Sequence, residues 1–147
     1  MAKVYVSGVV DAPVETVWAY ARDFNGHGAW HPLITHSEVE EGRPSDQVGC
    51  VRSFTVADGG HLRERLLAFS DLERSFTYSI LVSPMPIENY VATFAVKPIT
   101  EGAKTFVEWY ATYDVGPQDA GRIAEQVGRH TFAAGIVALE KAVKGRG

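Results

Sequence analysis

Apolar and polar residues alternate along most of this chain, and the period changes to that of a helix near each end. Residues 3–10 alternate at the period of a strand, in which neighbouring side chains point to opposite faces. Asp11-Ala12-Pro13 then supplies a capping residue and an early proline, which are typical of a helix start. Residues 23–32 are rich in glycine and aromatic residues and predict a short second helix or a turn. The chain is therefore expected to begin with one strand followed by one or two short helices.

Strand patterns dominate the middle of the chain. Turn-forming residues separate them, such as Asp58-Gly59-Gly60, which is a strong hairpin signal. Ser83-Pro84-Met85-Pro86 also ends a strand, because proline cannot donate to a sheet. The alternation predicts six further strands, at residues 34–41, 48–57, 61–69, 75–82, 90–98 and 104–115.

The period changes again near Asp119, and the pattern predicts one long helix that runs to about Val143. Two adjacent apolar stripes follow this helix, and together they are wider than the surface that a flat sheet would cover. The expected fold is of the α+β class, with a seven-stranded, mainly antiparallel sheet wrapped around the C-terminal helix. Residues 1–147 are expected to form a single domain with a pocket between the two layers.

Three charged residues share the strand phase of apolar neighbours. Arg52 is in phase with Phe54, Glu64 lies between leucines two residues away on each side, and Glu108 is in phase with Tyr110. An unpaired charge is expensive to bury. A sheet that turns these three side chains inward is therefore expected to line a wet or ligand-filled cavity rather than a dry core.

Arg52 is the first candidate for ligand contact or catalysis. Its guanidinium stays charged at biological pH and presents a rigid donor fork to a carbonyl or carboxylate oxygen. The alternative is a structural ion pair with Glu64 or Glu108. Those two carboxylates could act as a general acid or base, because apolar surroundings raise the pKa of a carboxyl group. They could equally serve only to neutralise Arg52.

Aromatic and helical residues complete the candidate site. Tyrosine combines an apolar ring with a polar tip, although ordinary packing is the expected role of Tyr78. Trp30 either caps the mouth of the cavity or packs in the core, and one stripe of the long helix faces the same hollow. The candidate ligand-contacting residues are Trp30, Phe54, Tyr78, Asn89, Tyr90, Glu108, Tyr110, Val127 and Thr131.

His130 is the candidate histidine for proton transfer, since histidine titrates near neutral pH, and a structural role is the alternative. No carboxylate is clearly placed beside His27, His31 and His36, so no metal is expected. No glycine-rich loop follows a strand and opens a helix, and no cofactor is expected. The single cysteine, Cys50, is expected to be a small core residue.

Composition narrows the class of partner. The 147 residues carry a net charge of −4 and no basic stripe, so no nucleic-acid partner is expected. No apolar run is long enough to span a membrane, the N-terminus lacks a signal-peptide pattern, and a cytoplasmic location is expected. The expected partner is a hydrophobic small molecule. Trp109 or Tyr113, if it faces outward, could mark the patch of a homodimer.

Five segments, taken in order, resemble the START-related SRPBCC superfamily, which includes birch-pollen allergens, plant abscisic-acid receptors and bacterial polyketide cyclase/dehydrases. The resemblance spans essentially the whole chain and implies a helix-grip fold. The segments are residues 48–52, 62–66, 87–90, 107–109 and 132–142.

The resemblance also implies roles for single residues. Arg52 matches the strand arginine that is thought to hold a carbonyl oxygen or enolate in aromatase/cyclase members. Glu64, Asn89, Tyr90 and Glu108 match polar cavity positions of the receptor branch. The two loops at the cavity mouth lack that branch's gate and latch sequences, so hormone reception is not expected.

Two hypotheses for the function stay open. In the first, the protein binds a hydrophobic small molecule and acts on it as a cofactor-independent enzyme of the polyketide cyclase/dehydrase kind. In that case Arg52 would stabilise an oxyanion, and Glu64 or His130 would move protons. The alternative is a non-catalytic carrier or sensor of a lipid-like or aromatic metabolite.

Overall fold

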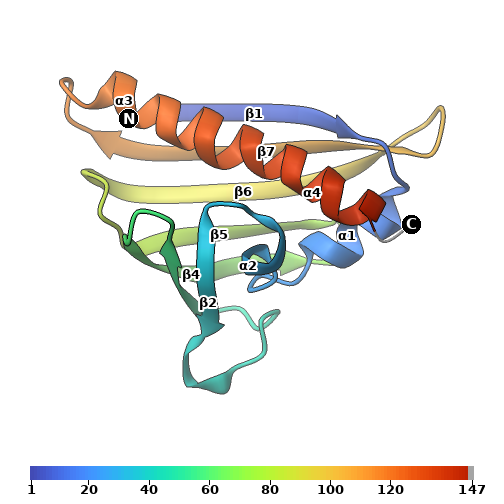
Figure 1. Ribbon diagram of the computed structural model, residues 1–147, viewed down its shortest axis with the longest axis horizontal. Helices are drawn as coiled ribbons and strands as arrows, with labels where there is room; N and C mark the ends of the chain where they lie inside the picture. Colours follow the sequence, from blue (N-terminus) through green and yellow to red (C-terminus); the bar gives the residue numbers. More distant parts are fainter. Residues whose placement is uncertain (146–147) are drawn as a thin grey trace.

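A computed structural model describes residues 1–145 of the chain, and within them seven strands form one antiparallel sheet (Figure 1). The order across the sheet is β1-β7-β6-β5-β4-β3-β2, so each strand from β2 onward pairs with the next along the chain, and β1 pairs with β7. The strands are β1 (Ala2–Val10), β2 (Ile34–Val39), β3 (Val51–Val56), β4 (His61–Ser70), β5 (Ser75–Val82), β6 (Ile87–Ile99) and β7 (Lys104–Val115).

Helices cover the inner side of this sheet. Two short helices, α1 (Val14–Ala21) and α2 (His27–Trp30), follow the first strand, and a 3₁₀ turn, η1 (Glu40–Gly42), follows β2. The last helix lies across the sheet in Figure 1 and consists of α3 (Ala120–Glu125), η2 (Gln126–Ala133) and α4 (Ala134–Gly145). The expected seven-stranded antiparallel sheet, short helices and long C-terminal helix are confirmed for the described residues.

The middle section of the last helix, η2, is π-helical, which was not expected from the sequence. A π-helix bonds residues five apart, so side chains five positions apart come into line. The buried residues of the last helix follow that change of spacing: Ile123 and Val127 are four apart, Val127 and Phe132 are five apart, and the buried apolar residues after Phe132 are three or four apart. The π section therefore brings the two apolar stripes of the sequence onto one face toward the sheet.

Gly135 permits the closest approach between this helix and the sheet. A Cβ atom at this position would lie 2.8 Å from Cζ3 of Trp109 and 3.0 Å from Cδ2 of His31. Because the first distance is shorter than real Cβ contacts, a larger residue here would force Trp109 or the helix to shift. The loss of helix propensity at Gly135 is thus explained by packing.

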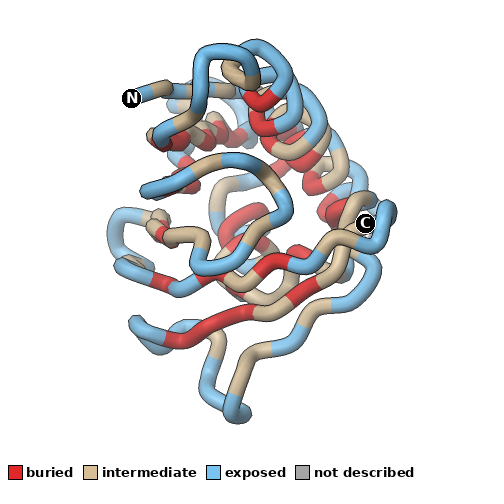
Figure 2. Tube along the Cα trace, turned by 90° about the vertical axis from the view of Figure 1, so that its left-hand side faces the viewer, coloured by how far each residue is buried: buried red, intermediate tan, exposed pale blue. Residues whose placement is uncertain are grey.

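The buried residues lie on facing inner surfaces of the sheet and the helices, as the red sections of Figure 2 show. Aromatic rings dominate the core. Trp109 stacks on Phe132 of η2 with ring centroids 4.7 Å apart, and Phe94 meets the same indole edge-on at 5.2 Å. This cluster fixes the helix over β6 and β7 and leaves the space over β3 to β5 less filled.

Candidate functional site

A cavity of about 530 Å³ lies between the last helix and the inner face of the sheet. Strands β3, β4 and β5 provide one wall, and residues 122–131 of the helix provide the other. The loops at residues 57–58 and 83–85 border it as well. Most lining side chains are apolar, and fewer residues contribute polar groups to the wall.

A buried ion pair forms part of the wall. Arg52 on β3 and Glu64 on β4 are direct partners in the strand register and are only 3% and 5% exposed. Nε of Arg52 donates to Oε1 of Glu64 at 2.8 Å, and Nη2 lies 2.6 Å from the same oxygen. Nη1 donates to the carbonyl oxygen of Phe24, whose ring lies 3.9 Å from the guanidinium carbon. The alternation in β3 and β4 predicted both side chains inward, and the structure brings them together.

The ionisation of Glu64 is governed by two opposing effects. Burial raises the pKa of its carboxyl group, and the charge and hydrogen bond of Arg52 lower it by less. The result is a raised pKa. Since the pair lines the cavity and carries opposite charges, it presents polar atoms to a ligand without adding net charge.

Two tyrosines contribute hydroxyl groups. The indole N–H of Trp109 donates to Oη of Tyr78 at 3.1 Å, and the rings of Tyr78 and Tyr90 lie 6.4 Å apart. Burial is the main cause that raises the pKa of both tyrosines, so both hydroxyls stay protonated at neutral pH. Tyr78, Tyr90 and Trp109 all line the cavity.

His27 is a lining residue that the sequence analysis considered only as a metal ligand. Its ring meets Phe54 edge-on, with centroids 4.7 Å apart, and Nε2 lies 3.2 Å from Oγ of Ser37. Ser37 donates its own proton to Oδ1 of Asn25, so Nε2 of His27 is the donor in the first bond. Burial lowers the pKa of His27 well below its ordinary value, which keeps the ring neutral. Its position in a short glycine-rich helix carried no sequence signal of burial.

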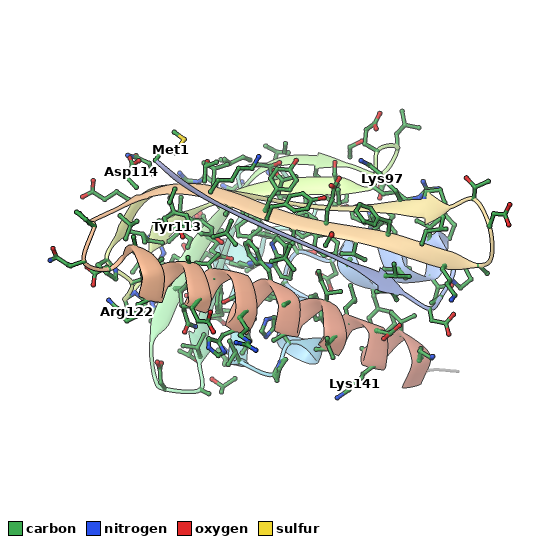
Figure 3. All side chains as sticks on the ribbon, turned by 90° about the horizontal axis from the view of Figure 1, so that it is seen from above. Met1, Lys97, Tyr113, Asp114, Arg122 and Lys141 are labelled. Atoms are coloured by element: carbon green, nitrogen blue, oxygen red, sulfur yellow. The ribbon has the colours of Figure 1, made fainter. Side chains whose placement is uncertain are left out.

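The helix presents two rows of residues to the cavity, each with a spacing of four. The inner row is Ile123, Val127 and Thr131, and the outer row is Arg122, Gln126 and His130. The outer row is exposed, and Figure 3 shows Arg122 at the beginning of the helix, away from Lys141. His130 is thus placed at the rim of the cavity, while Arg122 pairs with Asp119 at 2.8 Å. Because Arg122 and Gln126 lie eight and four residues before His130, the helical period could have predicted them as neighbours of His130 at the rim.

The cavity wall contains most of the predicted site residues. They are Arg52, Phe54, Glu64, Tyr78, Tyr90, Val127, His130 and Thr131.

The prediction that Glu108 and Tyr110 face the cavity is wrong. Glu108 lies on the outer face of β7, where it accepts hydrogen bonds from Oη of Tyr5 at 2.7 Å and Nζ of Lys97 at 3.0 Å. The bond from Tyr5 is the main cause that lowers the pKa of Glu108. Tyr110 stacks on Tyr5 with centroids 5.9 Å apart. The alternative phase of β7 faces inward, so Trp109 is buried.

Two other predicted residues lie away from the cavity wall. Asn89 is exposed, has a positive φ of 54°, and donates to Oδ2 of Asp114 at 2.8 Å. Trp30 borders a much smaller pocket beside His27, and its indole N–H is buried without a hydrogen-bond partner among the described residues. The expectation that Trp109 or Tyr113 marks an outward patch is also wrong, because both are buried.

His31 is a structural residue that connects the chain before β2 to the last helix. The backbone N–H of Leu33 donates to Nδ1 of His31 at 3.2 Å, so Nε2 carries the proton and donates to the carbonyl oxygen of Thr131 at 2.8 Å. Burial lowers the pKa of His31, and the bond to Thr131 opposes this shift. Neutral His31 therefore fixes η2 against the loop.

Among residues 1–145, no group of three or more His, Cys, Asp or Glu side chains is arranged to hold a metal ion. Over the same residues, no helix combines the length and apolar character needed to cross a membrane.

Solved structures share this architecture over nearly the whole chain. Protein XoxI from Bacillus cereus is 33% identical with a TM-score of 0.87, and the match covers 98% of this chain and 96% of that one. A protein from Thermobifida fusca is 30% identical with a TM-score of 0.86, covering 99% and 95%. The aromatase/cyclase ZhuI from a Streptomyces species is 17% identical with a TM-score of 0.81, covering 99% and 94%.

No curated protein matches the sequence significantly. Residues 1–144 match a protein-family model that is described as polyketide cyclase / dehydrase and lipid transport. The family match, the 33% identity to XoxI and the helix-grip architecture agree with the resemblance noted in the sequence. This chain belongs to the polyketide cyclase / dehydrase and lipid transport family.

Proposed function

We propose that the protein binds one hydrophobic small molecule in the cavity between the sheet and the last helix. The observation that carries the proposal is the cavity itself, about 530 Å³ of space with a mainly apolar wall and a buried Arg52–Glu64 pair. Ligand sites commonly occupy about 300–1,000 Å³, with few polar groups among apolar ones. Binding would cover apolar surface and give the polar atoms of the wall a partner.

The contacts of Arg52 with protein atoms favour ligand binding over catalysis that depends on this residue. The guanidinium is in contact with Glu64 and with the carbonyl oxygen of Phe24, so three of its nitrogen atoms already have protein partners. An arginine that stabilised a developing oxyanion would need donors aimed at free space. A non-catalytic carrier or sensor role needs no such donors.

Cyclase or dehydrase catalysis is the second candidate, and the raised pKa of Glu64 is the observation that favours it. A carboxyl group that opens onto a cavity and has a raised pKa can serve as a general acid or base. His130 at the rim is a second group for proton transfer. The aromatase/cyclase among the structural neighbours shares the fold, and its 17% identity supports no more than that.

Filling the cavity tests the binding proposal. Val127 is 1% exposed on the cavity wall, and Val137 is 55% exposed on the same helix outside the cavity. We expect Val127→Phe to weaken binding of the neutral dye N-phenyl-1-naphthylamine at least tenfold, and Val137→Phe to leave it within twofold. The measurement is a fluorescence titration, with circular dichroism to confirm that both variants fold.

The wild-type titration should saturate at one dye per chain. Absence of saturable binding, or an equal loss in both variants, contradicts the proposal. Native mass spectrometry of protein purified from its own host would add an independent result, since a ligand retained by the wild type should be missing from the Val127→Phe variant.

A further inference from the structure

We infer that the cavity selects an uncharged ligand that carries a hydroxyl group, such as a phenol or an alcohol on an apolar skeleton, and that Glu64 accepts the hydrogen bond from this hydroxyl. The inference rests on the proposed binding function and specifies the ligand class. It assigns recognition to the carboxylate of the buried pair and a supporting role to Arg52.

Arg52 has little left to offer a ligand. Its Nε donates to Oε1 of Glu64, Nη2 lies 2.6 Å from that oxygen, and Nη1 donates to the carbonyl of Phe24. The guanidinium carbon lies 3.9 Å from the ring centroid of Phe24 and 4.9 Å from that of Tyr78. Three of the five N–H groups of the guanidinium are thus directed at protein oxygens, and two aromatic rings flank it.

Glu64 differs because both contacts from Arg52 fall on one of its two oxygens. Oε2 has no hydrogen-bond partner in residues 1–145. Trp30 Nε1 and Tyr113 Oη are the fully buried side-chain atoms in that range that lack a partner. Oε2 of Glu64 also lacks a partner but is not fully buried, so it must be accessible to a small molecule. Since Glu64 lines the cavity and is 5% exposed, the opening is toward the cavity. An ionised carboxylate oxygen accepts hydrogen bonds only, and it therefore requires a donor.

The charges around this position exclude an anionic group. Arg52 and Glu64 cancel each other, and His27, Tyr78 and Tyr90 are neutral. A ligand carboxylate beside Oε2 would place a second negative charge in a buried environment where Arg52 is already paired with Glu64. The cation at the rim, Arg122, already pairs with Asp119, and Asp58 stands on the loop across the opening.

The tyrosines supply the complementary donor. Oη of Tyr78 accepts from the indole N–H of Trp109, and both Tyr78 and Tyr90 lie on the cavity wall. Each neutral hydroxyl carries one proton that it can donate to a ligand oxygen. A ligand hydroxyl can donate to Glu64 and accept from a tyrosine at the same time, whereas an ether or a ketone can only accept.

Three naphthalenes of similar size test this assignment by isothermal titration at pH 7. They are 2-naphthol, 2-methoxynaphthalene and 2-naphthoic acid, which is ionised at that pH. We expect 2-naphthol to bind at least tenfold more tightly than the methyl ether, since a hydrogen bond to a charged group has about that effect. The naphthoate should bind most weakly.

Variants of Glu64 test whether this residue causes the preference for naphthol over the ether. Glu64→Gln should reduce the preference for naphthol over the ether and should raise the relative affinity of the naphthoate, because Arg52 then keeps an unbalanced charge. If Glu64→Gln fails to fold, the double variant Arg52→Met/Glu64→Leu removes the whole pair, and it should bind naphthol and the ether equally. Tyr113→Phe is the matched control, because Tyr113 is buried outside the cavity wall and its loss should leave the preference unchanged.

The outcomes separate the two proposals. Equal affinities of wild type for naphthol and the ether, or tighter binding of the naphthoate, overturn the selection of a hydroxyl and leave ligand binding intact. A preference that survives in both Glu64 variants assigns recognition to another group and also overturns the inference. Failure of the wild type to bind any of the three compounds and the neutral dye overturns the proposed function itself.

Discussion

The most informative stability experiment compares Arg52→Met alone with Arg52→Met/Glu64→Leu. In the single variant, Glu64 keeps its charge at a position that is 5% exposed and loses the two nitrogen atoms that contact Oε1. The carbonyl of Phe24 also loses its donor. Removing one partner of a buried pair costs about 3–5 kcal/mol, and we expect a loss of that size in the free energy of unfolding.

The double variant should recover most of that loss. Two apolar side chains leave no buried charge, and replacing a whole buried pair by apolar residues is often neutral or stabilising. The orphaned carbonyl of Phe24 remains, at a cost of about 1–3 kcal/mol. We therefore expect the double variant to fall between the single variant and wild type.

Urea unfolding followed by tryptophan fluorescence measures the free energy of unfolding of both variants. Its dependence on pH tests the direction of the effect of Glu64. The pKa of Glu64 is raised in the folded protein, and loss of Arg52 removes the effect that opposes the raise. Folded Glu64 therefore binds its proton at a pH where the unfolded chain has lost it, and its contribution to stability declines as the pH rises through the raised pKa. The deficit of Arg52→Met should shrink when the pH is lowered toward the ordinary pKa of glutamate. A deficit below about 1 kcal/mol at pH 7, or a double variant less stable than the single one, would refute this reasoning.

Three further results are expected. Gly135→Ala should destabilise the fold by about 1–3 kcal/mol because its Cβ would meet Trp109, whereas Gly121→Ala, which meets open space, should stabilise it by about 0.5–1 kcal/mol, both in urea unfolding. The pKa of His31 is lowered by burial, so its contribution to stability is lost as the pH falls below the ordinary pKa of histidine, and His31→Gln should flatten this part of a melting-temperature profile. Glu108→Gln should change the affinity for N-phenyl-1-naphthylamine less than twofold, since Glu108 lies on the outer face of the sheet, and a larger change would contradict that placement.

The inward direction of Arg52 and Glu64 could be predicted because every residue in phase with them near the strand centre is apolar or small. In β7 both phases carry large apolar residues, and the charge at Glu108 alone predicts that its face lines a cavity. The phase of Trp109 contains no charged residue before the strand ends, and this uninterrupted apolar phase was the signal for its burial. Glu108 is instead satisfied by partners from two neighbouring strands, which no pattern within one strand can reveal.

The residues that give the site its chemistry depend on contacts between distant segments. His27 is buried because it packs on Phe54 of β3, and Tyr78 is oriented by Trp109, which is 31 positions away in the chain. Alternation fixes the face of a strand but not the partner of a side chain on that face. The inward position of Arg52 was therefore predictable from sequence, and its ion pair with Glu64 was an open alternative that only coordinates could decide. Its contact with the carbonyl of Phe24 had no signal in the sequence.

The π-helical section η2 has a consequence for how the chain can vary in length. Deleting one residue inside 126–133 would let the wide turn relax to α-helical hydrogen bonding, and Leu139 and Val143 could keep their places in the core. The same deletion within α4 would rotate every later side chain by about a quarter of a turn and move both residues off the sheet. Homologues with a shorter last helix are therefore expected to carry the gap beside the cavity, where it would also alter the shape of the wall.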